Sequence, residues 1–459
     1  MSASKDKTIE FDRLSRRIDG KLITPSDNDY ASSSRLFYPM VTGKPAAVVR
    51  VASATDVSAV IGEAASRGLE LAVRSGGHSL AGHSTVDDGI VIDVRDLNTL
   101  EIDTASRTAW AGSGLTAVDF TLGAAKHGLG VGFGDTGSVG IGGITLGGGV
   151  GFLVRRYGLT IDSLLAAEVV TADGQILRTG AESHPDLFWA LRGGGGNFGV
   201  VTRFKFALQS IDPFVGGFLI LPASDDAVEG FIELSESAPE ELSTIANVMS
   251  APPMPFIPDE LVGTTMVMGM IAWCGEIEPG MRMMDRFREL GEPVFDTLGA
   301  QPYTEMYPPE DVEYVPTAVA RTGFTDSLDS RKIRALVSEI EASDAPMRVV
   351  QLRVLGGAMA RMPSDATAFA HRDRKLMVNT AAFYESEEDR PIREIWVANL
   401  AKILTDGEID GYIGFLGDEG GDRVRAAYPG STWDRLRRVK AEYDPENLFH
   451  RNQNIPPAD

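Results

Sequence analysis

The sequence has little cysteine, little histidine and no long apolar run, and each shortage excludes a class of protein. Cys274 is the single cysteine in 459 residues. This excludes an intrachain disulfide framework and a zinc site with several thiolate ligands. No apolar stretch reaches the roughly 18 residues that a membrane-spanning helix needs, and the longest lies around Met266–Trp273. The six histidines lack the spacing of a metal site, so we expect no bound metal.

Positive charge is also scarce, with 43 Lys and Arg against 65 Asp and Glu, for a formal net charge of −22. Such a surplus of negative charge argues against nucleic acid or an anionic membrane as a partner. The segment Met1–Lys7 is polar and lacks an apolar core, so we expect no secretory signal and a cytoplasmic, soluble protein. The oligomeric state cannot be read from the sequence.

The chain is too long for a single hydrophobic core, and its pattern of predicted strands and helices changes near residue 210. Before that point, strands predicted at Pro45–Val51 and Glu70–Arg74 flank a helix predicted at Asp56–Arg67. Two stretches, Gly130–Gly151 and Gly193–Gly199, are dense in glycine. Because glycine lets a backbone approach another group closely, these stretches predict contact with a long ligand.

After about Ile211 the pattern predicts a second domain of α+β type. Apolar alternation predicts strands at Gly217–Leu221, Thr264–Trp273, Met347–Val354 and Met377–Phe383. Amphipathic periodicity predicts helices at Ala227–Leu234, Gly280–Leu290, Arg331–Ala342 and Ile392–Leu404. Together they indicate an antiparallel sheet flanked by helices.

His78 is the candidate of greatest interest, because it follows Gly76 and Gly77 in the segment Arg74–His83. Two glycines after an apolar run let the backbone approach a ligand and place one imidazole against it. The alternative is a loop histidine that bonds only to a backbone carbonyl. A pair of further motifs bears on this choice: Pro185–Thr202, and the tail Asn452–Ile455.

With these motifs the chain resembles the vanillyl-alcohol-oxidase/PCMH flavoproteins, and within them the berberine-bridge-enzyme-like group. The resemblance is dense over roughly residues 25–208 and 350–457 and thin between them. It implies a two-domain α+β fold. Residues 1–210 would form an FAD-binding domain, residues 211–414 an inserted substrate domain, and residues 415–459 a tail that returns to the FAD domain.

The resemblance implies FAD bonded covalently from His78 to the flavin 8α-methyl group. Many relatives carry a second tethering cysteine where this chain has Thr136, so no cysteinyl bond is expected. The remaining residues implied to contact FAD are Arg74, Ser75, Gly76, Gly77, Ser79, Gly82, His83, Thr136, Gly137, Val139, Gly140, Gly142, Gly143, Gly149, Gly199, Val200, Asn452 and Asn454.

The implied activity is oxidation of a small molecule by removal of a hydride from a C–H bond next to a hydroxyl or amine. Val139 stands where the family places its oxygen gate, and valine there resembles the oxidases. Electrons would then pass to O₂ and give hydrogen peroxide. A dehydrogenase that uses another acceptor stays an alternative, and the substrate itself is not identified.

The residues that would handle the substrate proton are where this chain departs from its relatives. Trp433 replaces a tyrosine that helps remove the proton in several relatives, and an indole cannot act as a base. Tyr412, Arg353, Gln351 and Tyr384 are the candidates to orient or deprotonate the substrate, each also readable as a partly buried structural side chain. A catalytically degenerate FAD-carrying binding protein therefore stays open.

One rival reading comes from Gly132–Gly137, which satisfies the dinucleotide fingerprint Gly-x-Gly-x-x-Gly. More glycines follow where that motif requires a helix, and no convincing buried strand precedes it. A nicotinamide-dependent dehydrogenase is thus disfavoured.

Overall fold

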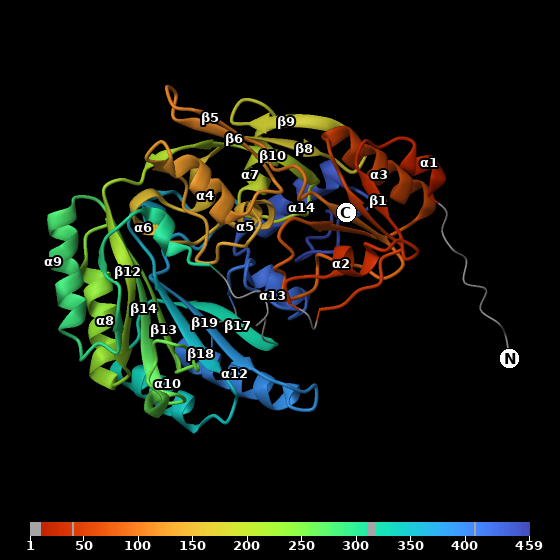
Figure 1. Cartoon of the computed structure of the whole chain (residues 1–459). Helices are drawn as coiled ribbons and strands as arrows, with labels where there is room; N and C mark the ends of the chain where they lie inside the picture. The colour runs from red at the N-terminus through yellow and green to blue at the C-terminus, as the bar shows by residue number, and fades with distance from the viewer. Residues whose placement is uncertain (1–10, 39–40, 310–316, 408–409) are drawn as a thin grey trace.

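The computed structural model describes residues 11–38, 41–309, 317–407 and 410–459. The segment Met1–Lys7, on which the cytoplasmic prediction depends, lies outside these ranges. Figure 1 shows two parts: one holds the N-terminal strands and the C-terminal helices, and the other is a broad sheet with helices packed on it. No helix in the described ranges is long and apolar enough to cross a membrane.

The N-terminal sheet has the strand order β1-β2-β4-β3, with β2, β4 and β3 parallel. Its strands are β1 (Lys21–Ile23), β2 (Ala47–Arg50), β3 (Leu71–Arg74) and β4 (Ile90–Asp93). Helix α3 (Ala54–Arg67) makes the crossover between β2 and β3. It begins where Ser53 accepts a hydrogen bond from the Asp56 amide, and it ends at Gly68 with a left-handed φ of 63°. The predicted βαβ unit is confirmed.

A second, antiparallel sheet has the order β5-β6-β10-β8-β9. Its strands are β5 (Leu100–Asp103), β6 (Thr108–Gly112), β8 (Leu164–Val170), β9 (Ile176–Gly180) and β10 (Val200–Ala207). The helical segments of this region are α1 (Asp12–Ser15), α2 (Tyr30–Ser34), α4 (Ala117–Ala125), α5 (Ile141–Gly147), α6 (Val154–Tyr157), η1 (Thr160–Ser163) and α7 (Pro185–Leu191). The pair β7 (Leu129–Gly130) and β11 (Gln209–Ser210) leads to the second part.

The large sheet follows the order β15-β12-β14-β13-β18-β19-β17, with β16 paired to β12. Its strands are β12 (Phe214–Pro222), β13 (Leu242–Ser250), β14 (Thr265–Cys274), β15 (Phe295–Asp296), β16 (Gly299–Ala300), β17 (Ala318–Thr325), β18 (Arg348–Val354) and β19 (Leu376–Phe383). Its long helices, on one face in Figure 1, are α8 (Asp225–Ser237), α9 (Ile277–Arg288), α10 (Ser330–Ala342) and α12 (Arg390–Leu404). Short helical turns are η2 (Asp259–Leu261), η3 (Tyr303–Met306) and α11 (Ala358–Arg361).

The predicted strands and helices of this sheet are present, and the predicted α+β class with an antiparallel sheet is confirmed. Strands β13 and β17 were not predicted. All nine residues of β13 are buried, because helices α8 and α10 pack on one face and α6 contacts the strand as well. Because polar residues such as Ser243 and Asn247 are buried along with the apolar ones, the sequence of β13 lacks the apolar–polar alternation by which a strand is normally predicted.

The C-terminal segment returns to the first part of the molecule, as Figure 1 shows for α13 (Gly421–Ala426) and α14 (Ser431–Tyr443). The return agrees with the predicted topology, while the boundaries at 210/211 and 414/415 stay a prediction.

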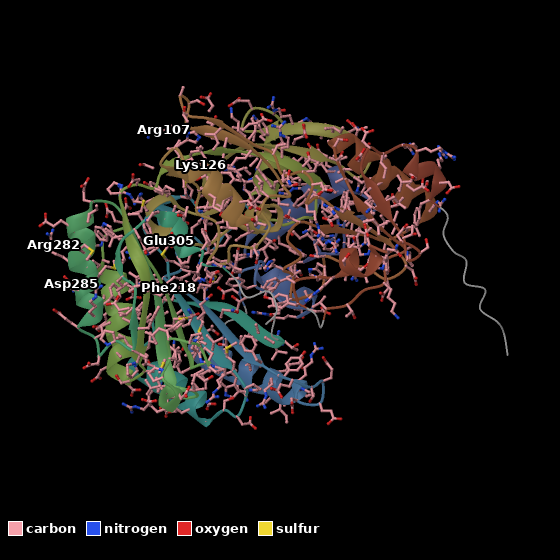
Figure 2. The ribbon with its side chains drawn as sticks, in the orientation of Figure 1. Arg107, Lys126, Phe218, Arg282, Asp285 and Glu305 are labelled. Carbon is pink, nitrogen blue, oxygen red and sulfur yellow. The ribbon has the colours of Figure 1, made fainter. Side chains whose placement is uncertain are left out.

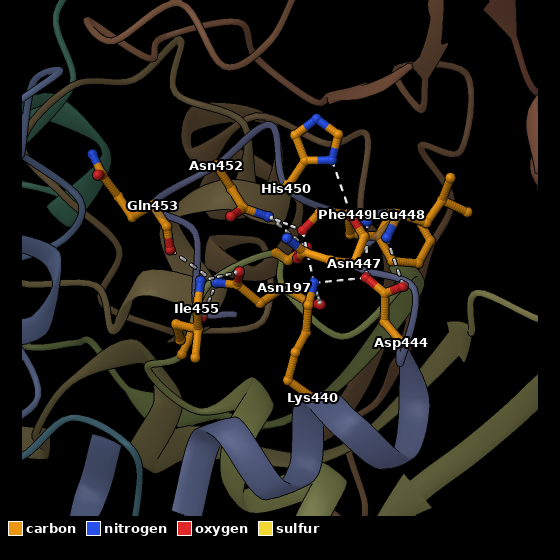
Figure 3. A network of polar contacts seen from close by, with 12 residues as sticks. Asn197, Lys440, Asp444, Asn447, Leu448, Phe449, His450, Asn452, Gln453 and Ile455 are labelled. Carbon is orange, nitrogen blue, oxygen red and sulfur yellow. Dashed lines mark hydrogen bonds and ion pairs between the residues drawn. The ribbon is translucent and has the colours of Figure 1, made fainter. Parts of the chain in front are cut away.

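A buried ion pair fixes this tail (Figure 3). Lys440 Nζ lies 2.6 Å from Asp444 Oδ2, and both side chains are fully inaccessible to solvent. The ammonium also donates to the carbonyl oxygens of Asn197 and Phe449. The Asp444 carboxylate accepts from the amides of Leu448 and Phe449. These bonds tie helix α14 and the tail to the glycine-rich loop before β10.

We expect Lys440→Met to lower the free energy of unfolding by about 3–5 kcal/mol, because it leaves the Asp444 carboxylate buried without its counter-charge. Chemical denaturation monitored by circular dichroism would measure the loss. The matched control is Arg282→Gln, since Arg282 pairs with Glu278 at 2.7 Å on the outer surface of α9 (Figure 2). An exposed pair contributes below about 1 kcal/mol, so equal losses in the two variants would contradict the assigned role of Lys440.

Candidate functional site

A cavity of about 440 Å³ lies where the glycine-rich loops meet the C-terminal tail. This volume is within the range of ligand-binding pockets. The wall draws on six separate stretches of the chain, within residues 37–38, 71–84, 134–150, 195–201, 412–416 and 449–453, together with Val94 and Ser113. The site therefore depends on both ends of the sequence.

His78 stands on this wall. Its Nε2 lies 3.0 Å from the Ser138 hydroxyl oxygen. Its ring stacks on Phe37 with the ring centroids 3.8 Å apart and the planes inclined by 21°. The hydroxyl and the aromatic ring together hold the imidazole in one orientation.

The two glycine loops touch through their backbones at Gly76 and Gly140. A Cβ on Gly76 would lie 2.3 Å from the Gly140 amide nitrogen, and a Cβ on Gly140 would lie 2.2 Å from the Gly76 amide nitrogen. Gly77 adds a left-handed φ of 74°. The packing of the two loops against each other therefore requires these glycines. The packed loops then form the wall of the cavity.

Other positions on the wall leave room for a ligand. A Cβ on Gly143 or Gly196 would meet no atom within 4 Å. The Asn452 side-chain nitrogen donates to the Gly196 carbonyl, while its buried Oδ1 has no partner among the described residues. An unpaired buried oxygen beside open glycine backbone fits a polar ligand.

His83 also lines the cavity. Burial, with the nearby positive charge of Arg451, lowers the pKa of His83 to about 4. The imidazole is therefore neutral at pH 7.

Tyr412 closes another side of the cavity. Its hydroxyl oxygen accepts a hydrogen bond of 3.0 Å from the Gly149 amide, and only 3% of the residue is exposed. Burial raises its pKa to about 12. Gly414 is required here, because a Cβ on it would lie 2.6 Å from the Tyr412 ring.

A polar cluster joins the cavity to the large sheet. Arg353 Nη2 lies 2.8 Å from Asp135 Oδ2, and Gln351 Nε2 donates to the same oxygen at 3.1 Å. Gln351 Nε2 also donates to Asn247 Oδ1 on β13. Among the cavity-lining residues, Asp135 carries the single carboxylate.

Two family models match the chain. The model described as FAD binding domain matches residues 45–180, and the model described as berberine and berberine like matches residues 411–456. The (R)-6-hydroxynicotine oxidase of Paenarthrobacter nicotinovorans is 31% identical, over 96% of this chain and 97% of the relative.

This chain belongs to the berberine-bridge-enzyme-like family of FAD-linked oxidoreductases.

Solved structures agree with this family. The crystal structure of 6-hydroxy-D-nicotine oxidase from Arthrobacter nicotinovorans has a TM-score of 0.82 at 27% identity, with 96% of this chain and 98% of that chain covered. A berberine-bridge-like enzyme of Physcomitrella patens has a TM-score of 0.84 at 20% identity, with 98% and 100% covered, and supports the fold alone. The rival nicotinamide reading is wrong: the segment after Gly132–Gly137 enters no helix before Ile141.

The structure of this berberine-bridge-like flavoenzyme brings most of the predicted cofactor residues to the cavity wall. Those that line it are Ser75, Gly76, Gly77, His78, Ser79, His83, Thr136, Val139, Gly140, Gly142, Gly143, Gly199, Val200 and Asn452. Their contacts with FAD stay a prediction. The cofactor itself is FAD, as the family model indicates.

Arg74 does not line the cavity, although its neighbours Val73 and Ser75 do, and its contact with FAD stays a prediction. Its guanidinium is 1% exposed and lies 2.7 Å from Asp93 Oδ2. A buried cation needs a buried anion more than an exposed ligand. Arg74 thus stiffens the start of the His78 loop from behind.

Four other predicted cofactor residues also lie off the wall. Gly149 has φ 76° and packs against Thr160, and Gly82 has φ 75° and packs against Val41. The Gly137 carbonyl accepts from the Val118 amide. Asn454 is turned into the tail, where its Oδ1 has no partner among the described residues.

Two predicted catalytic residues, Tyr384 and Trp433, likewise do not line the cavity, and their roles stay a prediction. The Tyr384 hydroxyl lies 3.5 Å from Glu387 Oε1, beyond the end of β19. Trp433 packs against Tyr428 on helix α14. Tyr412 and Val139 line the cavity, whereas Gln351 and Arg353 stand behind Asp135.

Sequence reasoning missed Asp135, Phe37 and Tyr38, which all line the cavity. Asp135 carried a usable signal, because it is an acidic side chain inside a glycine-rich loop, and binding and catalytic residues often lie on loops. Phe37 and Tyr38 precede the first predicted strand and offer no pattern. Only the fold brings them beside His78.

We expect Gly76→Ala to reduce the FAD content of purified protein to a small fraction of the wild-type value. The added methyl group would push the Gly140 backbone away and collapse the contact between the two loops. The flavin-to-protein absorbance ratio measures this. Gly62→Ala on α3 is the matched control, because a Cβ there meets no atom within 4 Å; a Gly76 variant with full flavin would contradict the packing argument.

Proposed function

We propose that this flavoenzyme is an oxidase that carries FAD bonded covalently to His78 and acts on a small molecule with a C–H bond next to a hydroxyl or amine. FAD, when bound, would supply the hydride acceptor, and its electrons would pass to O₂ to give hydrogen peroxide. The observation that carries the proposal is His78 itself, held at the cavity wall by Ser138 and Phe37.

The geometry of Ser138 supports this tether. A hydroxyl bonded to Nε2 fixes the orientation of the imidazole, and it can donate to or accept from this nitrogen. The imidazole held in this orientation is the proposed nucleophile for the flavin 8α-methyl group. Phe37 restricts rotation of the ring from the other direction.

A single tether is supported by the position of Cys274. Its thiol is buried beside Tyr157 and the Ser210 carbonyl, in a core cluster apart from the cavity. Burial raises the pKa of this thiol, which disfavours the thiolate needed for bond formation. Thr136 stands on the cavity wall with no sulfur to offer.

The substrate class is proposed from the relatives. The 31% identical protein is named (R)-6-hydroxynicotine oxidase, so 6-hydroxynicotine is the first compound to test. Aromatic alcohols and amines extend the screen. Peroxide release, measured with a coupled peroxidase, identifies the substrate and separates an oxidase from a dehydrogenase that needs another acceptor.

We expect His78→Ala to abolish covalent flavin and Ser138→Ala to lower the covalent fraction, because the ring loses the partner on Nε2. Acid precipitation followed by in-gel flavin fluorescence measures both. Ser237→Ala on α8 is the control, since that hydroxyl is exposed and bonds within its own helix. Flavin that stays with precipitated His78→Ala protein would refute the tether.

We expect Val139→Leu to slow flavin reoxidation by O₂ at least about tenfold, a barrier change of about 1.4 kcal/mol, and to change reduction by substrate much less. The larger side chain would fill part of the cavity wall where O₂ is proposed to approach. Stopped-flow absorbance separates the two half-reactions. Equal slowing of both would remove the gate from Val139.

A further inference from the structure

The two carboxylate oxygens of Asp135 differ in their hydrogen bonds to the protein. Oδ2 receives Arg353 at 2.8 Å and Gln351 at 3.1 Å. No residue in the described part of the chain donates a hydrogen bond to Oδ1. Because Asp135 lines the cavity and its side chain is 16% exposed, this oxygen is accessible to a bound molecule.

The two side chains bonded to Asp135, Arg353 and Gln351, cannot accept the substrate proton. Every nitrogen of the Arg353 guanidinium donates to protein: Nε and Nη2 to Gln351 Oε1, Nη1 to the Val150 carbonyl, and Nη2 to Asp135. Arg353 is a permanent cation and 2% exposed. Neither it nor Gln351 can accept a proton.

The tyrosines near Asp135 stay protonated. Burial, reinforced by the negative charge of Asp135, raises the pKa of Tyr38 to about 12. The pKa of Tyr412 is raised to about 12 by the same two causes, although the Gly149 amide and Arg353 oppose them. Burial likewise raises the pKa of Tyr307, whose hydroxyl donates to the Gly134 carbonyl. Within the described part of the chain, Asp135 therefore faces one cation, Arg353, and the three neutral phenols of Tyr38, Tyr412 and Tyr307.

We propose that Asp135 is the catalytic base of this enzyme and that Gln351 and Arg353 are its positioning residues. The proposal rests on the oxidase function above. The substrate O–H or N–H bond breaks and its proton moves to Asp135 Oδ1. The adjacent C–H bond breaks and its electron pair leaves as hydride to the oxidised flavin, so the product is a carbonyl compound or an imine.

The positioning role follows from the geometry of the pair. A guanidinium and an amide that converge on Oδ2 hold the carboxylate plane, so that Oδ1 alone faces the cavity. Arg353 itself is fixed by the Val150 carbonyl and stacks over the Phe415 ring at 5.0 Å. This support comes from β18, while Asp135 comes from the loop before α5, so the base is assembled across the two parts of the molecule.

The test compares Asp135→Asn, Asp135→Glu and Arg353→Lys with wild type in the FAD-loaded enzyme. The probes are 6-hydroxynicotine, benzyl alcohol and benzylamine. We expect Asp135→Asn to slow anaerobic flavin reduction by roughly 10²–10⁴-fold, the range of general base catalysis, and to abolish the fall in rate at low pH. Asp135→Glu restores that acid limb, and Arg353→Lys shifts its midpoint while lowering kcat more than it raises KM.

Two controls isolate the proton step. Reduction by dithionite and reoxidation by O₂ should be unchanged in all variants, because neither needs a substrate proton. Asp285→Asn on the outer surface of α9 (Figure 2) should match wild type throughout. Asp135→Asn alone leaves the Arg353 cation without its counter-charge, whereas the double variant Asp135→Asn/Arg353→Gln removes both charges. If the acid limb is lost because the base is missing, the double variant must lose it as well.

A binding titration with benzylamine, followed by the change in flavin absorbance, keeps the test independent of turnover. We expect Asp135→Asn to weaken binding roughly tenfold to hundredfold, the usual effect of losing a hydrogen bond to a charged group. Unchanged affinity together with an unchanged pH profile would overturn the role of Asp135 and leave the oxidase intact. A wild-type enzyme that neither binds nor oxidises any probe would also overturn the role of Asp135. Binding that depends on Asp135, without release of peroxide, would contradict only the proposed oxidase function.

Discussion

Glycine backbone forms much of the cavity wall, and glycine has no side chain whose packing could fix that backbone in place. The rest of the structure depends on this constraint. The Gly76 and Gly140 backbones approach too closely for any Cβ between them. Backbone of this kind is flexible unless it is fixed from behind, because glycine loses the most conformational freedom on folding. The molecule meets this cost with buried polar contacts placed outside the wall.

Each loop of the wall has such a support. Arg74 pairs with Asp93 beneath the His78 loop. Arg372 donates to both carboxylate oxygens of Asp162, at 2.7 and 2.8 Å, in the turn that follows the glycine-rich stretch Gly130–Gly151. Lys440 pairs with Asp444 under the glycine loop before β10. A buried pair adds little net stability over apolar packing but is costly to break, so these pairs fix geometry more than they contribute to stability.

Much of the fold could be predicted from the sequence, because helices and strands that bury one face keep a regular period. Helix α3 with its Ser53 cap and the βαβ unit around it are of this kind. Strand β13 could not be predicted, since its two covered faces erase the alternation. In the site, His78 and the glycines were predictable from local composition. That Arg74, Tyr384 and Trp433 do not line the cavity was not predictable, because it depends on contacts between distant segments.

The catalytic residues are the least predictable part of the site for a physical reason. A base requires a proton-accepting atom at one point in space, and any loop that reaches this point can supply it. In this chain Gln351 and Arg353 occupy the strand that faces the cavity, yet neither can accept a proton. The negative charge lies instead on Asp135, on the cavity wall directly in front of these two side chains and hydrogen-bonded to both. The role of Asp135 therefore depends on Gln351 and Arg353, which lie on a different element. A sequence motif that contains only one of these segments cannot predict the proton acceptor.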